Sequence, residues 1–145
     1  MIRAAVLADL PELLVLEQCC FPEDAWSVNA IASELGRSGS IVRVAEVAGA
    51  VVGSAVGWVI ADGLEVLRVA VHPSVRQQGW GRQLLDALEA AHPEVQEAWL
   101  EVREDNVAAI RLYTQAGYVQ NGRRPRYYHD GCAALLYRKE LPARG

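Results

Sequence analysis

The stretch from Val71 to Ala90, VHPSVRQQGWGRQLLDALEA, constrains the fold more than any other part of the sequence. An apolar strand ends at a proline, a loop with two arginines and two glycines follows, and leucines at helical spacing come next. A helix start exposes about four unpaired backbone N–H groups and carries a partial positive charge. Glycines let an anion approach these amides, and Arg76 and Arg82 add positive charge, so the loop predicts a pyrophosphate cradle. A glycine-rich turn with solvated arginines is the alternative.

The spacing of this loop argues against two common nucleotide motifs. It does not match GxGxxG, and it lacks the GK[ST] ending of a P-loop, so dinucleotides and ATP are poor candidate ligands. The candidate cofactor-binding residues of the loop are Arg76, Gln77, Gln78, Gly79, Trp80, Gly81 and Arg82.

The order of apolar patterns predicts an α/β fold with a mixed, mostly antiparallel sheet flanked by helices. Strands at 64–71 and 97–103 flank the helix at 79–91, which predicts parallel neighbours joined by a right-handed crossover. An antiparallel hairpin is expected at 41–63, around Ala-Gly-Ala. The remaining predicted elements are a helix after an Asp9–Glu12 capping box, a helix from Ser27 to about Gly36, a helix at 106–117, and strands at 118–122 and 132–141.

Length and composition indicate a single domain over residues 1–145 with an ordinary core. Hydrophobic residues make up 52 % of the chain, but no apolar run approaches the roughly 20 residues that span a bilayer. The first residues lack a secretory signal pattern, so we expect a cytoplasmic protein that does not bind membranes. The tail at 141–145 is expected to fray.

The net charge of −4 disfavours nonspecific nucleic-acid binding and mildly suits a cationic substrate. Cys19, Cys20 and Cys132 lack the spacing of a zinc or redox motif, so we expect buried, reduced thiols and no metal site.

The segment RVAVHPSVRQQGWGRQLLDALE resembles the acetyl-CoA-binding motif of the GCN5-related N-acetyltransferases (GNAT), Arg/Gln-x-x-Gly-x-Gly/Ala after a strand. Arg76, Gly79 and Gly81 fill this motif. The segments EQCCFPEDAWS, WLEVREDNVAAIRLYTQAGY and RRPRYYHDGCAALLYRKEL resemble the RimI branch, whose members acetylate the N-terminal alanine of a small-subunit ribosomal protein. The resemblance implies acetyl-CoA bound in a wedge between splayed parallel strands, with the backbone of Val69 and Val71 as partners.

Amide formation from an amine and a thioester requires a neutral amine and a proton for the departing thiolate. Strand alternation places Trp99, Glu101 and Arg103 on one face, and Glu101 is the candidate general base, a role that the resemblance also implies. A surface glutamate paired with Arg103 is the alternative interpretation. Glu65 is a rival base, because many members of the superfamily carry the base on that earlier strand.

Tyr113 is the candidate general acid, because a phenol holds its proton at neutral pH and can still donate to a leaving thiolate. It shares a helix face with Asn106 and Ile110, and core packing is the alternative role. Its segment LYTQAGY resembles the LYxxxGF-like segment of the family. Asn106 can cap its helix, and the resemblance implies that it also holds the pantetheine.

The resemblance implies a peptide groove with one wall at Trp26 beside the Pro22–Asp24 corner, and Tyr127 and Tyr128 are the candidates for the other wall. An exposed acidic turn at the first wall and a plain β-hairpin at the second are the alternatives. An α-amino group has a lower pKa than a lysine, about 7.7–8.0 against about 10.4, so it is the easier nucleophile. We therefore expect acetylation of an N-terminal amine, and the resemblance to the RimI branch implies that it belongs to a ribosomal protein. Because no cysteine lies in the motifs that would position an acyl carrier, we expect direct transfer in a ternary complex, by a monomer or weak dimer. Other N-termini, lysines or small amines as acceptors, and a noncatalytic acetyl-CoA sensor, are the alternatives.

Overall fold

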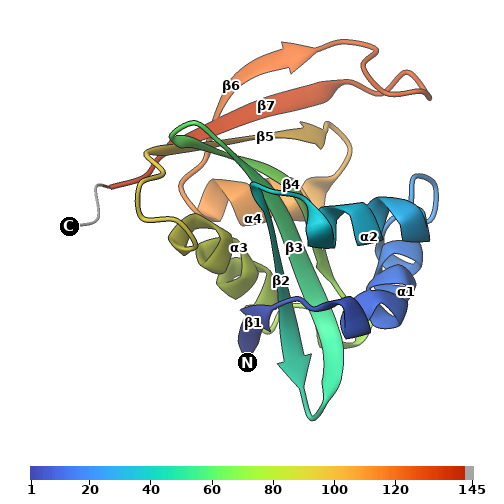
Figure 1. Ribbon diagram of the computed structural model, residues 1–145. Coiled ribbons are helices and arrows are strands. Elements are labelled where there is room, and N and C mark those ends of the chain that lie inside the picture. Colours follow the sequence, from blue (N-terminus) through green and yellow to red (C-terminus); the bar gives the residue numbers. More distant parts are fainter. Residues whose placement is uncertain (143–145) are drawn as a thin grey trace.

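The computed structural model describes residues 1–142, which form a seven-stranded mixed sheet with helices on both faces (Figure 1). The sheet order is β1-β2-β3-β4-β5-β7-β6, and only β4 and β5 pair in parallel, as predicted. The strands are β1 Ile2–Ala4, β2 Ser40–Val47, β3 Ala50–Ile60, β4 Gly63–Val71, β5 Glu97–Arg103, β6 Val119–Arg124 and β7 Ala134–Glu140. The helices are α1 Leu10–Cys20, α2 Val28–Gly36, α3 Trp80–Ala90 and α4 Val107–Gln115, with short 3-10 turns at Leu7–Asp9 and Pro73–Val75.

The two faces of the sheet carry different helices. Figure 1 shows α3 and α4 on one face and α1 and α2 on the other. The leucines of α3, Leu84, Leu85 and Leu88, are at most 1 % exposed and form the centre of the larger core. A smaller core under α1 and α2 contains Leu16 and Ile31. The helical leucine spacing therefore specifies which side of α3 the sheet covers.

The predicted β2–β3 hairpin is confirmed, and its turn explains the glycine at position 49. Ala48 and Gly49 both have positive φ, 52° and 82°, as the two central residues of a type I′ turn require. Strand β1, which pairs antiparallel with β2, was not predicted, since three residues are too few to show alternation.

The capping prediction for α2 is confirmed, whereas that for α1 is wrong. Ala30 N–H donates to Ser27 Oγ at 3.1 Å. Asp9 instead accepts hydrogen bonds from Val6 N–H and both terminal nitrogens of Arg3, all at 2.8 Å, and Arg3 lowers the pKa of this carboxyl. Glu12 accepts from Val51 N–H at 2.8 Å. Arg3 on β1 and the Val6 amide thus occupy the Asp9 carboxylate, while the donor to Glu12, Val51 on β3, is 39 residues away in the sequence.

The tail prediction is wrong for its first residue. Leu141 is buried, and its N–H donates to the Gln96 carbonyl at 2.9 Å, so the chain stays attached there. Residues 143–145 of the predicted tail lie outside the described residues. Among residues 1–142, no helix is both long and apolar enough to cross a bilayer.

Candidate functional site

Strands β4 and β5 separate half-way along their length. Their parallel pairing runs from Gly63 opposite Glu97 to Val66 opposite Leu100 and then stops. At the same place, β3 pairs Val56 with Arg68 and Gly57 with Val66, which leaves Leu67 as an extra residue. Such a bulge bends the strand that carries it. We call the separated strand ends after Val66 and Leu100 the splay.

Beyond the bulge, β4 directs backbone groups into the splay. His72 N–H donates to the Val52 carbonyl at 2.8 Å. Because the direction of the backbone groups alternates along a strand, the even-numbered residues in this part of β4 direct their N–H and C=O groups towards β3. Val69 and Val71 therefore direct their N–H and C=O groups away from β3. The Val71 carbonyl accepts from Arg76 Nε at 3.0 Å and from the Cys20 thiol at 3.5 Å.

The start of α3 has the backbone of an anion site. Gly79 is the N-cap residue with φ 88°, no side chain caps the helix, and Gln77 also has a positive φ of 63°. A Cβ at Gly79 would meet no atom within 4 Å, so backbone conformation is the reason for this glycine. A Cβ at Gly81 would lie 3.3 Å from Leu112, so this glycine allows α3 to pack close to α4. The free helix amides fit the phosphate groups of a coenzyme A derivative.

The two arginines of the loop behave differently. Arg76 is tied to the end of β4 through the Val71 carbonyl. Arg82 points along its own helix, with Nε 3.0 Å from Asp86 Oδ1 and a terminal nitrogen 3.2 Å from the Gln115 carbonyl. Arg76 is therefore the loop arginine next to the splay, and Arg82 joins α3 to α4.

Glu65 and Glu101 share the sheet face opposite the large core. Glu65 lies opposite Trp99 in the β4–β5 register, and Glu101 is two residues further along β5. Burial and the neighbouring Glu101 raise the pKa of the Glu65 carboxyl. The Glu101 side chain is 31 % exposed, with its Oε1 3.8 Å from an Arg124 nitrogen. Arg103 does not pair with Glu101 but with Asp105 and Asp130.

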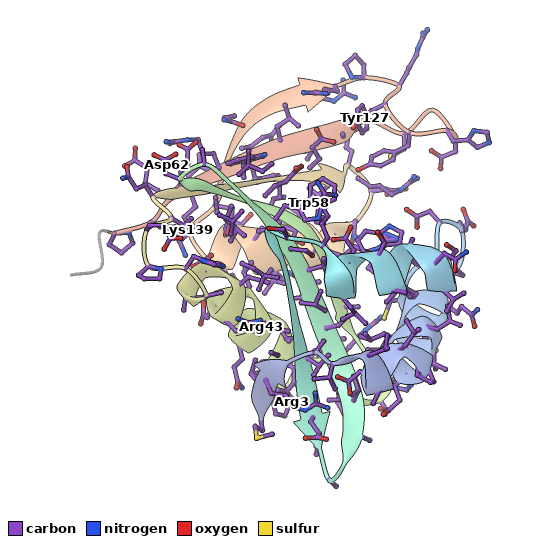
Figure 2. The ribbon with its side chains drawn as sticks, viewed as in Figure 1. Arg3, Arg43, Trp58, Asp62, Tyr127 and Lys139 are labelled. Carbon is purple, nitrogen blue, oxygen red and sulfur yellow. The ribbon has the colours of Figure 1, made fainter. Side chains whose placement is uncertain are left out.

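Tyr127 and Tyr128 lie beside Glu101 in the loop between β6 and β7. Figure 2 shows Tyr127 on the side of this hairpin that faces α2. The two rings pack edge-to-face with centroids 5.1 Å apart, and Arg103 stacks 4.9 Å from the Tyr128 ring centre. Interaction with the Glu101 carboxylate raises the pKa of the Tyr127 hydroxyl, while burial is the main cause that raises the pKa of Tyr128 to about 12.

Tyr113 is 6 % exposed on α4, and burial is the main cause that raises its pKa. No buried side-chain nitrogen or oxygen within residues 1–142 lacks a hydrogen-bond partner, and the Tyr113 hydroxyl bonds to none of these residues. Asn106 caps α4 as predicted, accepting from Ala109 N–H at 3.1 Å.

Comparisons with known proteins identify the family of this chain. Residues 10–118 match the model of the acetyltransferase (GNAT) family. The chain belongs to the GNAT family. An N-alpha-acetyltransferase RimI of Mycobacterium tuberculosis is 34 % identical over 96 % of the chain and 91 % of that protein. The crystal structure of the Escherichia coli ribosomal-protein-S18-alanine N-acetyltransferase superimposes with a TM-score of 0.89 and 30 % identity, covering all of this chain and 96 % of the other.

A longer relative is also known. An uncharacterised protein of Mycobacterium leprae is 37 % identical over 92 % of this chain, but the chain spans only 38 % of its length. The predicted family, fold class and N-acetyltransferase activity are confirmed. Acetyltransferases of the GNAT family use acetyl-CoA. Residues 1–142 contain no cluster of three or more His, Cys, Asp or Glu side chains that could hold a metal ion.

Sequence reasoning missed Arg68 and Glu17 of this GNAT chain. Arg68 lies beyond the bulge, on the α1 side of β4, and its charge meets Glu17 at 3.0 Å. Both side chains are nearly buried, at 12 % and 8 % exposure. The signal was present in LRVAV, where one arginine interrupts an otherwise apolar strand. An arginine at such a position requires a partner, because a buried unpaired charge is costly.

The prediction of buried thiols is wrong for Cys19 and holds only in part for Cys20 and Cys132. All three cysteines are free, but Cys19 is exposed because it lies on the outer side of the last turn of α1, while Cys20 and Cys132 are half-buried. Burial raises the pKa of the Cys20 thiol.

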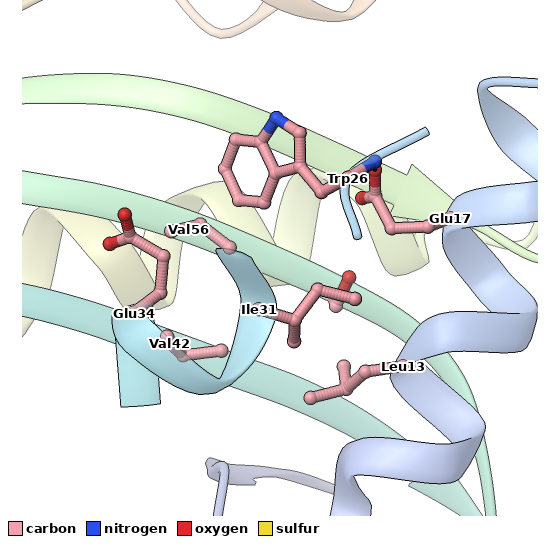
Figure 3. A pocket seen from close by; sticks show the side chains of 8 residues that line it. Leu13, Glu17, Trp26, Ile31, Glu34, Val42 and Val56 are labelled. Carbon is pink, nitrogen blue, oxygen red and sulfur yellow. Dashed lines mark hydrogen bonds between the residues drawn. The ribbon is translucent and has the colours of Figure 1, made fainter. Parts of the chain in front are cut away.

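A small cavity lies between α1, α2 and the sheet (Figure 3). Its open volume of about 20 Å³ admits a single water molecule. It is lined by Leu13, Glu17, Trp26, Ile31, Glu34, Val42, Ser54 and Val56, so Trp26 is the sole predicted site residue on its wall. The cavity is too small for a substrate, and the splay stays the candidate site.

Proposed function

We propose that this chain is an acetyl-CoA-dependent N-alpha-acetyltransferase that acts on the N-terminal alanine of a small-subunit ribosomal protein. The observation that carries the proposal is the splay, where the pairing of β4 and β5 stops. The uncapped start of α3 comes after β4, and the partly exposed Glu101 carboxylate follows Leu100 on β5. The E. coli structure with this substrate in its name supports the choice of acceptor.

Acetyl-CoA would be held mainly by backbone groups. The α3 amides at Gly79 to Arg82 and the side chains of Arg76, Gln77, Gln78 and Trp80 would bind the pyrophosphate region. Val69 and Val71 would bind the pantetheine, and an N–H directed at the developing oxyanion contributes about 2.7–4 kcal/mol in related sites. Asn106, whose Oδ1 already caps α4, would contact the pantetheine through the rest of its amide.

Glu101 would accept the proton of the acceptor ammonium, directly or through one water. Its partial exposure supports this role, because the carboxylate remains within reach of solvent and substrate. Glu65 lies on the same face, and its raised pKa makes it the second candidate. The nearby pair of carboxylates favours a cationic amine as the incoming group.

Tyr113 would supply the proton, or a hydrogen bond, to the leaving thiolate. Its raised pKa keeps the hydroxyl protonated across the neutral range. Direct transfer in a ternary complex follows, since an acyl-cysteine intermediate would need a thiol beside the reacting carbonyl. Cys20, the thiol nearest to the splay, has a raised pKa and is a poor nucleophile at neutral pH.

Trp26, Tyr127 and Tyr128 would form the walls that hold the acceptor peptide. Tyr127 is 45 % exposed, which is unusual for a large aromatic side chain and provides a free apolar surface next to Glu101. Single-domain organisation, cytoplasmic location and a monomeric or weakly dimeric state stay predictions.

The test is release of CoA thiol from acetyl-CoA with a short peptide that begins Ala-Arg. The matched control is the same peptide with a blocked N-terminus and an internal lysine. Turnover with the free terminus alone is the expected result. Turnover with the blocked peptide would move the function to lysine acetylation, and acetyl-CoA binding without turnover of either peptide would move it to small amines or to a sensor.

A further inference from the structure

Arg68 lies at the centre of a side-chain cluster between β4 and the loop that joins α1 to α2. Its guanidinium carbon lies 4.1 Å from the centre of the Phe21 ring and 4.6 Å from that of Trp26. A terminal nitrogen donates to the Asp24 carbonyl at 2.6 Å. Arg68 thus contacts the loop near its start, middle and end.

Glu17 completes this cluster from α1. Its Oε1 accepts from Arg68 Nε at 3.1 Å and from Trp26 N–H at 2.8 Å. Figure 3 shows the Glu17 carboxylate next to the backbone nitrogen of Trp26. One nearly buried ion pair therefore fixes both the side-chain and the main-chain position of the loop.

The same residue belongs to the strand that borders the splay. Arg68 follows the bulged Leu67 and precedes Val69, whose backbone is directed into the splay. Since alternation reverses at the bulge, Arg68 points towards α1 while its neighbour Val69 packs against the large core. The cluster therefore connects β4, whose backbone would bind acetyl-CoA, with the α1–α2 loop, whose Trp26 would contact the acceptor.

We propose that Arg68 is a positioning residue that holds the α1–α2 loop, residues 21–26, in the place where Trp26 meets the acceptor peptide. This inference rests on the proposed function for the identity of the acceptor. Lysine cannot replace the arginine, because an ammonium lacks the planar fork that stacks between two rings while bonding to Glu17 and Asp24 together.

Arg68→Lys is the first variant, because it keeps a positive charge opposite Glu17. We expect the KM for the Ala-Arg peptide to rise about tenfold or more, since a small misplacement of a binding group is costly, with kcat and the Kd of acetyl-CoA little changed. The control is Arg43→Lys on β2, an arginine whose guanidinium donates to the Val42 carbonyl and makes no contact with the loop. The control should keep the wild-type KM.

A double variant separates positioning from stability. Arg68→Met alone leaves Glu17 unpaired and destabilises the fold, whereas Glu17→Gln with Arg68→Met removes both charges and keeps an acceptor for Trp26 N–H. We expect the double variant to regain thermal stability while its peptide KM stays high. A wild-type KM in the stable double variant, or in Arg68→Lys, would overturn the proposal.

Hydrogen exchange provides a readout that does not depend on the acceptor. The Trp26 amide should lose protection in Arg68→Lys, while the Ala30 amide, bonded to Ser27 in α2, keeps it. Unchanged protection of the Trp26 amide would refute the positioning role even if the acceptor proves to be another amine. An inactive wild-type enzyme with the expected exchange pattern would instead contradict the proposed function and leave the role of Arg68 supported.

Discussion

The two sides of the splay are built from different materials. The proposed cofactor side consists mainly of backbone groups, namely the amides and carbonyls of β4 that are directed away from β3 and the uncapped first turn of α3. The proposed acceptor side consists of side chains, with Glu65 and Glu101 on the sheet, Tyr127 and Tyr128 in the β6–β7 loop, and the loop held by Arg68. Backbone recognition tolerates many side chains, whereas side-chain recognition changes with each substitution.

This difference predicts how each side responds to substitution. A site made of backbone needs only the bulge, the helix start and one residue with positive φ. A site made of side chains depends on several elements meeting in space. Blocking the backbone of the cofactor side should therefore abolish acetyl-CoA binding. Single substitutions on the acceptor side should instead reduce activity by different amounts.

Gly79→Asp should cause the largest effect, loss of measurable acetyl-CoA binding by calorimetry. Aspartate adds a negative charge to the helix start where phosphate is expected, and it replaces glycine at φ 88°. Gly49→Asp is a matched control, since Gly49 has φ 82° and open space around its Cβ position in the β2–β3 turn. Normal affinity in Gly79→Asp would show that the cradle lies elsewhere.

Glu101→Gln should lower kcat by about 10³-fold, within the range of general-base catalysis, with little change in acetyl-CoA affinity. The loss should shrink at high pH, where solvent deprotonates an α-amino group whose pKa is about 7.7–8.0. The pH–rate profile of the variant against wild type measures this. If Glu65→Gln causes the large loss of kcat and Glu101→Gln does not, the general base is Glu65 on β4.

Tyr113→Phe should lower kcat by about 10²-fold without loss of stability, because its hydroxyl bonds to none of the residues 1–142. Tyr118→Phe is the neighbouring control, with its ring 5.8 Å from that of Tyr113. Its hydroxyl donates to Glu89 at 2.8 Å, so this variant should lose about 1–3 kcal/mol of unfolding free energy and keep kcat. Equal kcat in wild type and Tyr113→Phe would show that Tyr113 is not the general acid.

The sequence predicted the backbone around the start of α3 better than the side-chain contacts between distant elements, for the same physical reason. Gly79, the strand before it and the leucines after it are local signals, and the observed bounds of α3 differ from the predicted ones by one residue at each end. The parallel β4–β5 pairing followed from the handedness of a crossover, which needs no knowledge of side chains.

Side-chain partners across the chain were the part that local patterns could not reveal. Arg68 and Glu17 are 51 residues apart, and the bulge at Leu67 places them on one face, against the simple alternation of the strand. Glu12 shows the same limit, since its spacing after Asp9 suits a capping box but its carboxylate accepts from Val51 N–H on β3, 39 residues away. A long-range donor decides the role of Glu12, and the sequence around this residue does not contain that donor.

Glu65→Gln should produce the smallest effect, and its pH dependence has a definite sign. Burial and Glu101 raise the pKa of Glu65 above 4.5, so the ionised carboxylate is less favourable in the folded state than in the unfolded one. The penalty is absent below the unfolded pKa and grows as pH rises through the folded pKa. Glu65→Gln should therefore raise Tm at pH 7, on the order of 1–2 °C, and leave it unchanged near pH 4.

Two comparisons sharpen this last prediction. Glu140→Gln removes one negative charge from a side chain that is 81 % exposed, so it controls for the change in net charge and should leave Tm at pH 7 nearly unchanged. In a Glu101→Gln background the gain from Glu65→Gln should shrink, because one of the two causes of the raised pKa is gone. A gain of equal size in both backgrounds would show that the two carboxylates do not interact, and the acceptor side would then lack the paired negative charge that favours a cationic amine.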